Sequence, residues 1–192
     1  EGSREGVCGI SWRRGVPTRE ALGGLCGPFA IAALAVRPAV IDSHCHLADE
    51  TFSADLEAVI TRAKDAGVEG ALVVLEAGNE QEAAQASKVA GLWPGARFTV
   101  GIHPHGAHEY GMNTQRASDV VRDQLAKTPL ARAVGEIGLD YHYDYSPREV
   151  QVVIFRAQIR LARELGLPIV VHTREADEDT LRVLREEGKG DV

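Results

Sequence analysis

Histidine and carboxylate side chains gather in this sequence where short apolar runs end. The stretch VIDSHCHL, residues 40–47, closes an apolar run with Asp42 and then places His44 and His46 two positions apart. On a strand, residues i and i+2 point to the same face, so the two imidazoles can converge on one point. A pair of converging imidazoles at the end of a strand indicates a metal site.

Three later apolar runs lead into residues of the same kind. The motifs are GIHPH with His103, GEIGLDYHYD with Glu136 and Asp140, and VVHTRE with His172 and Arg174. A carboxylate between two glycines in an apolar run must be paired or bind a metal. Histidines and a glutamate from neighbouring strands would supply most of a two-metal site. Asp140 could be a further ligand, could pair with Arg174, or could cap a turn.

The elements that position these residues are five short apolar runs that alternate with amphipathic stretches. The runs start about 30 residues apart, which indicates strand-plus-helix units, and their lack of polar alternation favours a parallel sheet covered by helices. The clearest helix is predicted over 146–165, with Ser146 as its N-cap, Glu149 completing a capping box and Gly166 ending it. The predicted strands are 39–42, 68–75, 97–102, 131–138 and 167–172.

Four of the five predicted strands deliver candidate residues at their carboxyl ends. In a barrel of strand–helix units these ends all open onto one face, where active sites lie. The arrangement favours a barrel over an open doubly wound sheet. A complete barrel usually needs about 250 residues. The predicted fold class is therefore α/β, a (β/α)8 TIM-like barrel that is C-terminally truncated, with about five βα units over residues 39–192.

Residues 1–38 differ from the rest of the chain. They are rich in glycine and contain the run GLCGPFAIAALAV, which is too short to span a bilayer. Arg13 and Arg14 precede the run, so it faintly resembles a twin-arginine export signal. The favoured interpretation is an atypical leader or upstream extension that is poorly ordered.

The overall composition limits the partners that the chain can have. The sequence has 192 residues, 44% of them hydrophobic, and a formal net charge of −7, as expected of a soluble globular domain. It has no long run of Lys and Arg, so bound cations would have to supply positive charge for an anionic substrate. Three cysteines without a CxxC pair favour a reducing compartment. We therefore expect a cytoplasmic protein that does not enter a membrane.

Several motifs, in this order, resemble those of the TatD-related metal-dependent deoxyribonucleases. They are IDSHCHL, GIHPH, GEIGLDYHYDYSPREVQ and the stretch from Phe155 to HTRE, and the resemblance covers about Val40 to Glu187. The resemblance implies a βα barrel related to the amidohydrolases. It also implies hydrolysis of phosphodiester bonds in DNA, with two divalent metal ions (Mg²⁺, Mn²⁺ or Zn²⁺) that activate water.

The resemblance further implies a role for individual residues. His44 and His46 would hold one metal, and Glu136 would bridge to a second metal that His172 also binds. The implied catalytic residues are Glu136, His103 and Arg174, of which the last two would line the phosphate site.

The implied substrate is DNA that is single-stranded or attacked from an end. The family pattern continues with a further histidine ligand and an aspartate in a TDSP-like stretch, and this sequence contains neither. A carbon–nitrogen amidohydrolase or another esterase on the same scaffold is one alternative, although such sites often bridge their metals with a modified lysine where this chain has Glu136. An inactive truncated remnant is the other alternative.

Overall fold

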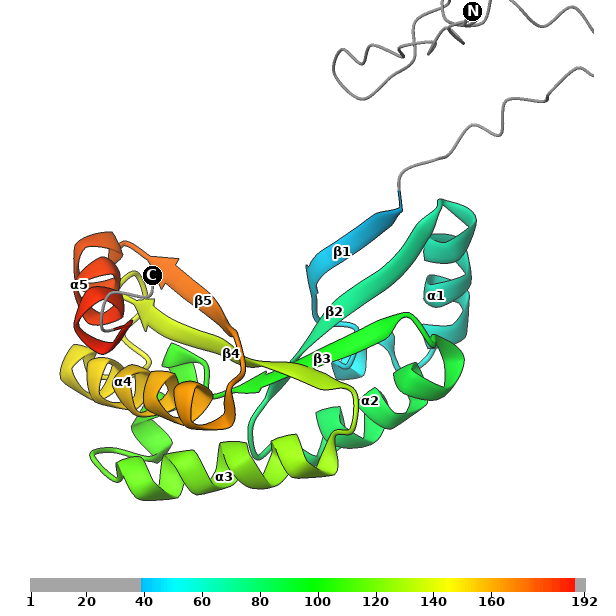
Figure 1. Ribbon diagram of the computed structural model, residues 1–192. Helices are drawn as coiled ribbons and strands as arrows, with labels where there is room; N and C mark the ends of the chain where they lie inside the picture. Colours follow the sequence, from blue (N-terminus) through cyan, green and yellow to red (C-terminus); the bar gives the residue numbers. More distant parts are fainter. Residues whose placement is uncertain (1–38, 189–192) are drawn as a thin grey trace, which may run out of the picture. The chain divides into compact units, whose positions relative to one another are not determined.

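The computed structural model describes residues 39–188, so the predicted leader over 1–38 lies outside the described residues. Strands and helices alternate along the described chain, as predicted (Figure 1). The strands are β1 (Val40–Cys45), β2 (Val68–Glu76), β3 (Ala96–Gly101), β4 (Ala131–Asp140) and β5 (Ile169–Arg174). The helices are α1 (Leu56–Asp65), α2 (Glu80–Leu92), α3 (Thr114–Lys127), α4 (Arg148–Leu165) and α5 (Asp177–Gly188), with short 3-10 turns η2 (Glu50–Phe52) and η3 (Pro104–Glu109).

The five strands form one sheet in the order β1-β2-β3-β4-β5, and every neighbouring pair is parallel. The sheet curls, and the helices cover its outer side (Figure 1). In a doubly wound sheet the strand order would reverse at a switch point, whereas in a barrel each strand pairs with the next one along the chain. The described residues therefore form a curled half-barrel of the (β/α)8 type, which confirms the predicted fold class.

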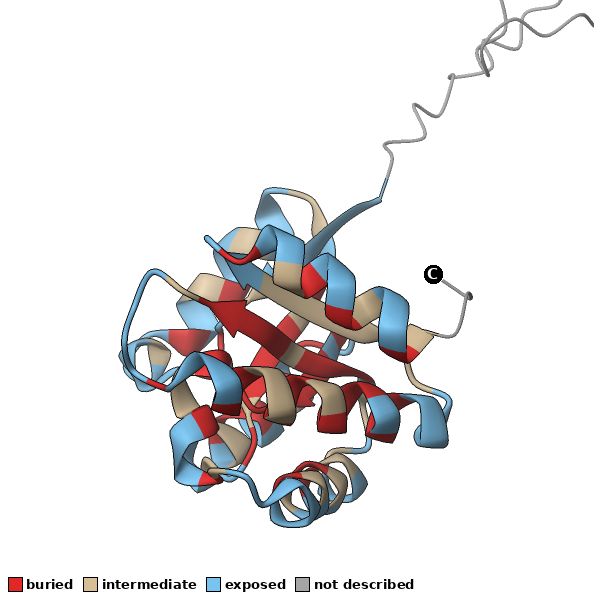
Figure 2. Cartoon of the chain, turned by 90° about the vertical axis from the view of Figure 1, so that its left-hand side faces the viewer, coloured by how far each residue is buried: buried red, intermediate tan, exposed pale blue. Residues whose placement is uncertain are grey.

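The core lies between the sheet and the helices. Buried residues are concentrated on the strands and on the helix faces that pack against them (Figure 2). Val73, Leu75, Val100, Ile137 and Leu139 are completely inaccessible to solvent. This explains the near-continuous apolar runs, since strands of a parallel sheet are covered on their faces. Among the described residues, no helix combines the length and the apolar character that crossing a membrane requires.

Helix α4 starts one residue later than predicted. Its N-cap is Pro147, and no side chain caps the helix there. The hydroxyl of Ser146, the predicted cap, instead donates to the carbonyl of His105 and accepts from the backbone N–H of His108. The predicted end is confirmed, because Gly166 stops the helix in the left-handed conformation, with φ of 65°.

Four strands run further toward their carboxyl ends than predicted, so that Asp140 lies on β4 and Arg174 on β5, whereas β3 ends one residue earlier, at Gly101. Gly138 pairs with His172, and a Cβ atom at Gly138 would collide with the carbonyl oxygen of His172. Only glycine permits this close approach, which brings the end of β4 beside the residues at the end of β5.

Candidate metal centre

The first of two groups of ligand atoms forms where β1 ends. His44 lies on β1 and His46 directly follows the strand, and their Nε2 atoms are 3.2 Å apart. Oε2 of Glu136, from β4, lies 3.3 Å from Nε2 of His44. These three residues, the β1 group, can each offer one ligand atom to the same ion. The group is open to solvent, since the His44 side chain is 39% exposed.

The second group, the β5 group, consists of His103, Glu136 and His172. Nδ1 of His172 lies 2.9 Å from Oε1 of Glu136 and 3.2 Å from Nε2 of His103. Glu136 therefore turns one carboxylate oxygen toward each group. The residues of the β5 group come from three neighbouring strands or their ends, and all three are half-buried.

Asp140 bonds to the nitrogen of His172 that faces away from the other ligands of the β5 group. Its carboxylate is fully buried, and Oδ2 lies 3.0 Å from Nε2 of His172 and 2.9 Å from Nε2 of His105. An Nε2–H of His172 donated to Asp140 leaves the lone pair of Nδ1 directed at Glu136 and His103, as metal-binding histidines require. The other oxygen accepts from the backbone N–H groups of His142 and Tyr143. Asp140 thus caps a turn and pairs with histidines, and it makes no contact of this kind with Arg174.

Two glutamines of α4 hold the ends of β3 and β4 in place. Gln151 accepts from the N–H of Asp140 and donates to its carbonyl, and Gln158 does the same for Ile102, the residue after β3. Both side chains are buried, so these bonds satisfy polar groups that would otherwise lose their contact with water. The two glutamines fix the backbone from which His103 and Asp140 project.

The protonation of the centre follows from burial and neighbouring charges. Burial works to raise the pKa of Glu136, but the hydrogen bond with His172 and the nearby histidines outweigh it, so the pKa is lowered. The hydrogen bond with Glu136 raises the pKa of His172. Burial also acts on Asp140, but hydrogen bonds led by that from His105 lower its pKa to about 2. The carboxylates at the centre are therefore ionised at neutral pH.

The pKa of His103 is shifted in the opposite direction from that of His172. Burial and the neighbouring histidines lower the pKa of His103 to about 4, so its ring is neutral at neutral pH. A neutral imidazole has one nitrogen lone pair, and in His103 the Nδ1 lone pair accepts from the backbone N–H of His105, which leaves the proton on Nε2.

The distances between ligand atoms fit divalent cations. Zinc binds imidazole nitrogen at about 2.0–2.1 Å, so two ligands of a tetrahedral site are about 3.3 Å apart. The separations in the β1 group, 3.2 and 3.3 Å, and in the β5 group, 2.9 and 3.2 Å, are of this size. Imidazole together with carboxylate is also a donor set that zinc or manganese accepts. The residues present therefore fit the metal pair that the sequence predicts.

The structure brings five of the predicted site residues together: His44, His46, His103, Glu136 and His172. His103, predicted to line a phosphate site, lies among the ligand atoms of the β5 group. Arg174 is exposed at the end of β5, where its guanidinium lies over the ring of Tyr143, 4.8 Å from the centroid.

Sequence reasoning missed Glu76, at the end of β2. Both carboxylate oxygens of Glu76 accept from the backbone N–H of His103, at 3.1 and 3.3 Å, and burial raises the pKa of Glu76 to about 8. The available signal was its position, since it directly follows an apolar run as the other candidates do. With Glu76 included, every strand of the described sheet delivers a histidine or a carboxylate to the same edge.

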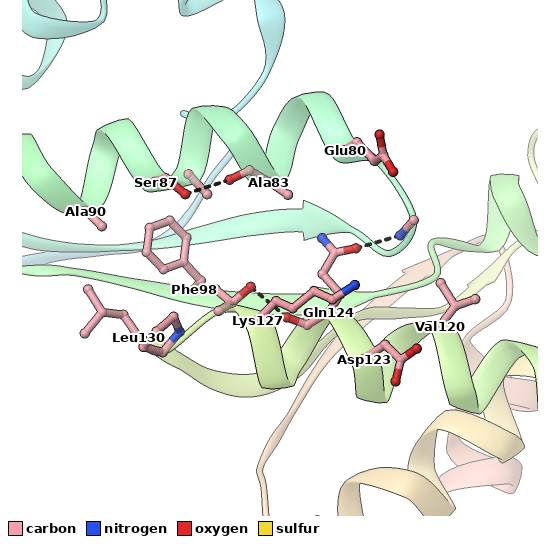
Figure 3. A pocket seen from close by; sticks show the side chains of 14 residues that line it. Glu80, Ala83, Ser87, Ala90, Phe98, Val120, Asp123, Gln124, Lys127 and Leu130 are labelled. Atoms are coloured by element: carbon pink, nitrogen blue, oxygen red, sulfur yellow. Dashed lines mark hydrogen bonds between the residues drawn. The ribbon is translucent and has the colours of Figure 1, made fainter.

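A cavity of about 480 Å³ lies away from the strand ends, between α2 and α3 (Figure 3). Phe98 and Leu130 form part of its apolar lining, and Gln124 is bonded to the backbone N–H of Gly78. Its lining contains no histidine or cysteine. The cavity therefore lacks the groups that the chemistry of the strand ends requires.

Comparisons with known sequences identify the family of this chain. The profile of a family described as TatD related DNase matches residues 41–192. YabD, an uncharacterized metal-dependent hydrolase of Bacillus subtilis, is 37% identical over 149 residues, which cover 78% of this chain and 56% of that protein. The 3′-5′ ssDNA/RNA exonuclease TatD of Erwinia billingiae is 39% identical over 146 residues, which cover 76% and 54%. The chain thus spans about half the length of these relatives.

Solved structures resemble the described fold. The crystal structure of YJJV, a TatD homologue of Escherichia coli K12, has a TM-score of 0.66 and 29% sequence identity, and the match covers 77% of this chain and 56% of that one. A TatD family hydrolase of Entamoeba histolytica has the same TM-score at 23% identity, covering 80% and 56%. The second likeness is one of fold alone.

Proposed function

Because this chain belongs to the TatD-related DNase family, we propose that it is a metal-dependent hydrolase that cleaves phosphodiester bonds in single-stranded DNA from an end. The observation that carries the proposal is the shared carboxylate: Oε2 of Glu136 faces His44 of the β1 group, and Oε1 faces His172 of the β5 group. A glutamate divided between two ligand groups is suited to bridging two cations, and two-metal sites are typical of nucleases. The name of the Erwinia billingiae relative supports a nucleic-acid substrate.

We assign the metal ligands as His44, His46, Glu136 and His172. The proposed ions are two of Mg²⁺, Mn²⁺ or Zn²⁺. When bound, such a pair lowers the pKa of a coordinated water and neutralises charge on the phosphate. Glu136 stays ionised because its pKa is lowered. His172 keeps its orientation because Asp140 holds the opposite side of its ring.

His103 and Arg174 are assigned to the phosphate. The imidazole of His103 is neutral at neutral pH, since its pKa is lowered to about 4. Its Nδ1 accepts from the backbone N–H of His105, so the proton of the neutral ring lies on Nε2, where it can be donated to a phosphate oxygen. Its Nε2 faces the ligand atom of His172, so a phosphate at the β5 group would lie within its reach. The exposed guanidinium of Arg174 adds a permanent positive charge at the same edge of the sheet.

The charge distribution of the chain supports binding at the end of a DNA strand. The chain carries a net charge of −7, and its sequence contains no basic run that would follow a long stretch of backbone. Attraction for DNA is therefore local to the centre. The odd number of cysteines, three without a CxxC pair, supports a reducing, cytoplasmic location. We interpret residues 1–38 as a leader or upstream extension separate from the catalytic domain at 39–192.

The proposal is tested by titrating Mn²⁺ into the full chain by calorimetry, alongside Glu136→Ala. We expect saturable binding that the substitution reduces by about 100-fold or more at both groups, because it removes a ligand from each. Glu82→Ala is a matched control: its carboxylate accepts from the backbone N–H of Glu76 and lies outside both groups. Equal binding by the wild type and Glu136→Ala would contradict the bridging role.

Cleavage is followed on an end-labelled single-stranded oligodeoxynucleotide in the presence of Mn²⁺. Products that shorten one nucleotide at a time would support attack from an end. Binding of Mn²⁺ without any cleavage would reject the nuclease function for this chain while leaving the metal centre in place.

A further inference from the structure

Two tyrosines on the loop after β4 lie beside the candidate metal centre and have no part in it. Tyr143 and Tyr145 are 37% and 59% exposed, and their rings stack on each other with centroids 5.2 Å apart and an angle of 28° between planes. The guanidinium of Arg174 also lies over the ring of Tyr143. We call Tyr143 and Tyr145 the tyrosine pair.

The tyrosine pair contacts the centre through a single side chain. The ring of His105 meets Tyr145 at 4.7 Å and Tyr143 at 5.5 Å between centroids, both edge to face. On its other side, His105 lies 4.3 Å from the ring of His103 and bonds to Asp140. One imidazole therefore separates the tyrosine pair from the β5 group.

An open hollow also joins Tyr145 to the centre. A cavity of about 820 Å³ is lined by Tyr145 and Asp144 on one side and by His103, His105 and Glu76 on the other. Binding sites for small ligands have volumes of about 300–1,000 Å³, so the hollow is large enough for a nucleotide. A group bound there can touch His103 and Tyr145 at once.

The tyrosine pair differs from the other tyrosines of the described chain. The hydroxyl of Tyr141 donates to Asp179, and that of Tyr110 donates to the carbonyl of Ala77, so both rings are tied into the fold. Among the described residues, no hydrogen bond reaches the hydroxyls of Tyr143 and Tyr145. Exposed stacked rings contribute little to a core, but they are the surface that unpaired bases use in single-strand binding proteins.

We propose that the tyrosine pair is a stacking surface for an unpaired base of the substrate, the base of a nucleotide whose phosphate lies at the β5 group. The proposal rests on the proposed nuclease function. Two acidic side chains near the tyrosine pair, Asp144 and Glu175, would repel phosphate groups of the nucleic-acid backbone, whereas a base is uncharged. A base inside a duplex has both faces covered by its neighbours, so the surface selects an unpaired or terminal base. It also tolerates any sequence, because every base has a π face.

The test measures binding of an oligodeoxythymidylate by the full chain loaded with Mn²⁺. The oligonucleotide carries a fluorophore and hydrolysis-resistant phosphorothioate linkages, so binding is read without cleavage. We expect Tyr145→Leu to weaken binding about ten-fold and Tyr145→Phe to change it less than about two-fold, since the ring, rather than the hydroxyl, makes the contact.

An abasic oligonucleotide of the same length separates stacking from a structural role. With no base to stack, Tyr145→Leu should bind it as well as the wild type does. An equal loss on both oligonucleotides, or no loss on either, would overturn the proposal, as would a wild type that binds neither.

A second variant guards against a fold defect in Tyr145→Leu. In Tyr145→Trp, stacking should quench the added indole fluorescence with the thymidylate and leave it unchanged with the abasic oligonucleotide. Quenching by both would count against base stacking. If the wild type cleaves DNA and Tyr145→Leu binds the thymidylate as tightly as the wild type does, the stacking surface is overturned and the nuclease function is retained. If Tyr145→Leu loses affinity only for the oligonucleotide with bases, and the wild type cleaves nothing, the stacking surface is retained and the nuclease function is rejected.

Discussion

In the β5 group, His172 is held on both sides of its ring, whereas the histidines of the β1 group are held on one side. Nε2 of His172 bonds to buried Asp140, and Nδ1 faces Glu136. Among the described residues, no hydrogen bond reaches the Nδ1 atom of His44 or of His46. Ligand histidines are usually oriented by such a bond to their second nitrogen. In the β5 group the fold therefore orients His172 through both ring nitrogens, whereas in the β1 group the contacts reach only the Nε2 atoms.

The strands that carry the two groups differ in the same way. β5 is covered by α5, which is tied to α4 through Glu187, and β4 is bonded to α4 through Gln151. β1 pairs only with β2 among the described residues, and Val40 and Ile41 are 50% and 59% exposed. Both β1 and β5 are edge strands of the described sheet, but α5 packs against β5 whereas β1 is largely exposed, so the two groups of ligands rest on different supports.

His172→Ala has the largest expected effect on this contrast. It removes the best-supported ligand, so we expect the tighter of two Mn²⁺-binding steps to weaken by about 100-fold or more in calorimetry. His44→Ala removes a ligand of the β1 group and should leave the tighter step within about three-fold. Equal losses of the tighter step in the two variants would show that the supports do not set the order of affinity.

Asp140→Asn tests the orienting bond itself. The amide group would face two imidazole nitrogens in place of a carboxylate, and we expect the tighter step to weaken by about 10- to 100-fold. Asp42→Asn is a matched control at the end of β1, where the carboxylate accepts from the backbone N–H of His44. The control should change both steps by less than about two-fold in the same titration. If Asp140→Asn weakened only the weaker Mn²⁺-binding step, the assignment of Asp140 to the β5 group would be wrong.

Glu187→Gln tests the support of β5 without touching a ligand. Arg160 and Arg156 donate to this largely buried carboxylate and lower its pKa to about 2. A carboxylate whose pKa is lowered by folding stabilises the native state above its unfolded pKa, and that stability is lost as the pH falls. We expect the substitution to reduce the free energy of unfolding by about 1–2 kcal/mol at pH 7.

The same substitution should have almost no effect near pH 2, because the wild-type carboxylate is then becoming protonated. Urea unfolding of both proteins at several pH values measures this difference. A difference that stays constant with pH would mean that packing, rather than charge, ties α5 to α4.

The smallest expected effect comes from removing one methylene group from an isoleucine on β4 and one from an isoleucine on β1. Ile137 on β4 is completely buried and Ile41 on β1 is mostly exposed. Ile137→Val should reduce the free energy of unfolding by about 1 kcal/mol, and Ile41→Val by less than about 0.5 kcal/mol. Chemical denaturation checks both values. Equal costs would indicate that Ile41 is covered in solution.

Much of the fold could be predicted from the sequence because strand signals and chemistry coincide at the strand ends. Apolar runs identified all five described strands, and the motifs placed His44 at the end of the first, Glu136 on the fourth and His172 on the fifth. Burial and register were not readable in the same way. Glu76 has no motif around it that marks it as functional, and its role depends on the backbone N–H of His103, which follows the next strand.

The sequence also misplaced polar groups that had two available partners. Ser146 fits a capping box by spacing, but its hydroxyl bonds to η3, a segment that lies 41 residues earlier at His105. Asp140 had three open assignments, and the parallel pairing of β4 with β5, which brings His172 beside it, decides between them. Local spacing cannot choose among such partners, since the choice depends on which elements become neighbours.

Gln151 and Gln158 impose a limit on the length of α4. They are two helical turns apart, about 10 Å along the helix, and one binds the end of β4 while the other binds the residue after β3. Inserting one residue between them would turn one amide by about 100° around the helix and release a strand end. The seven-residue spacing between these two glutamines therefore has to be kept for both strand ends to stay bonded to α4.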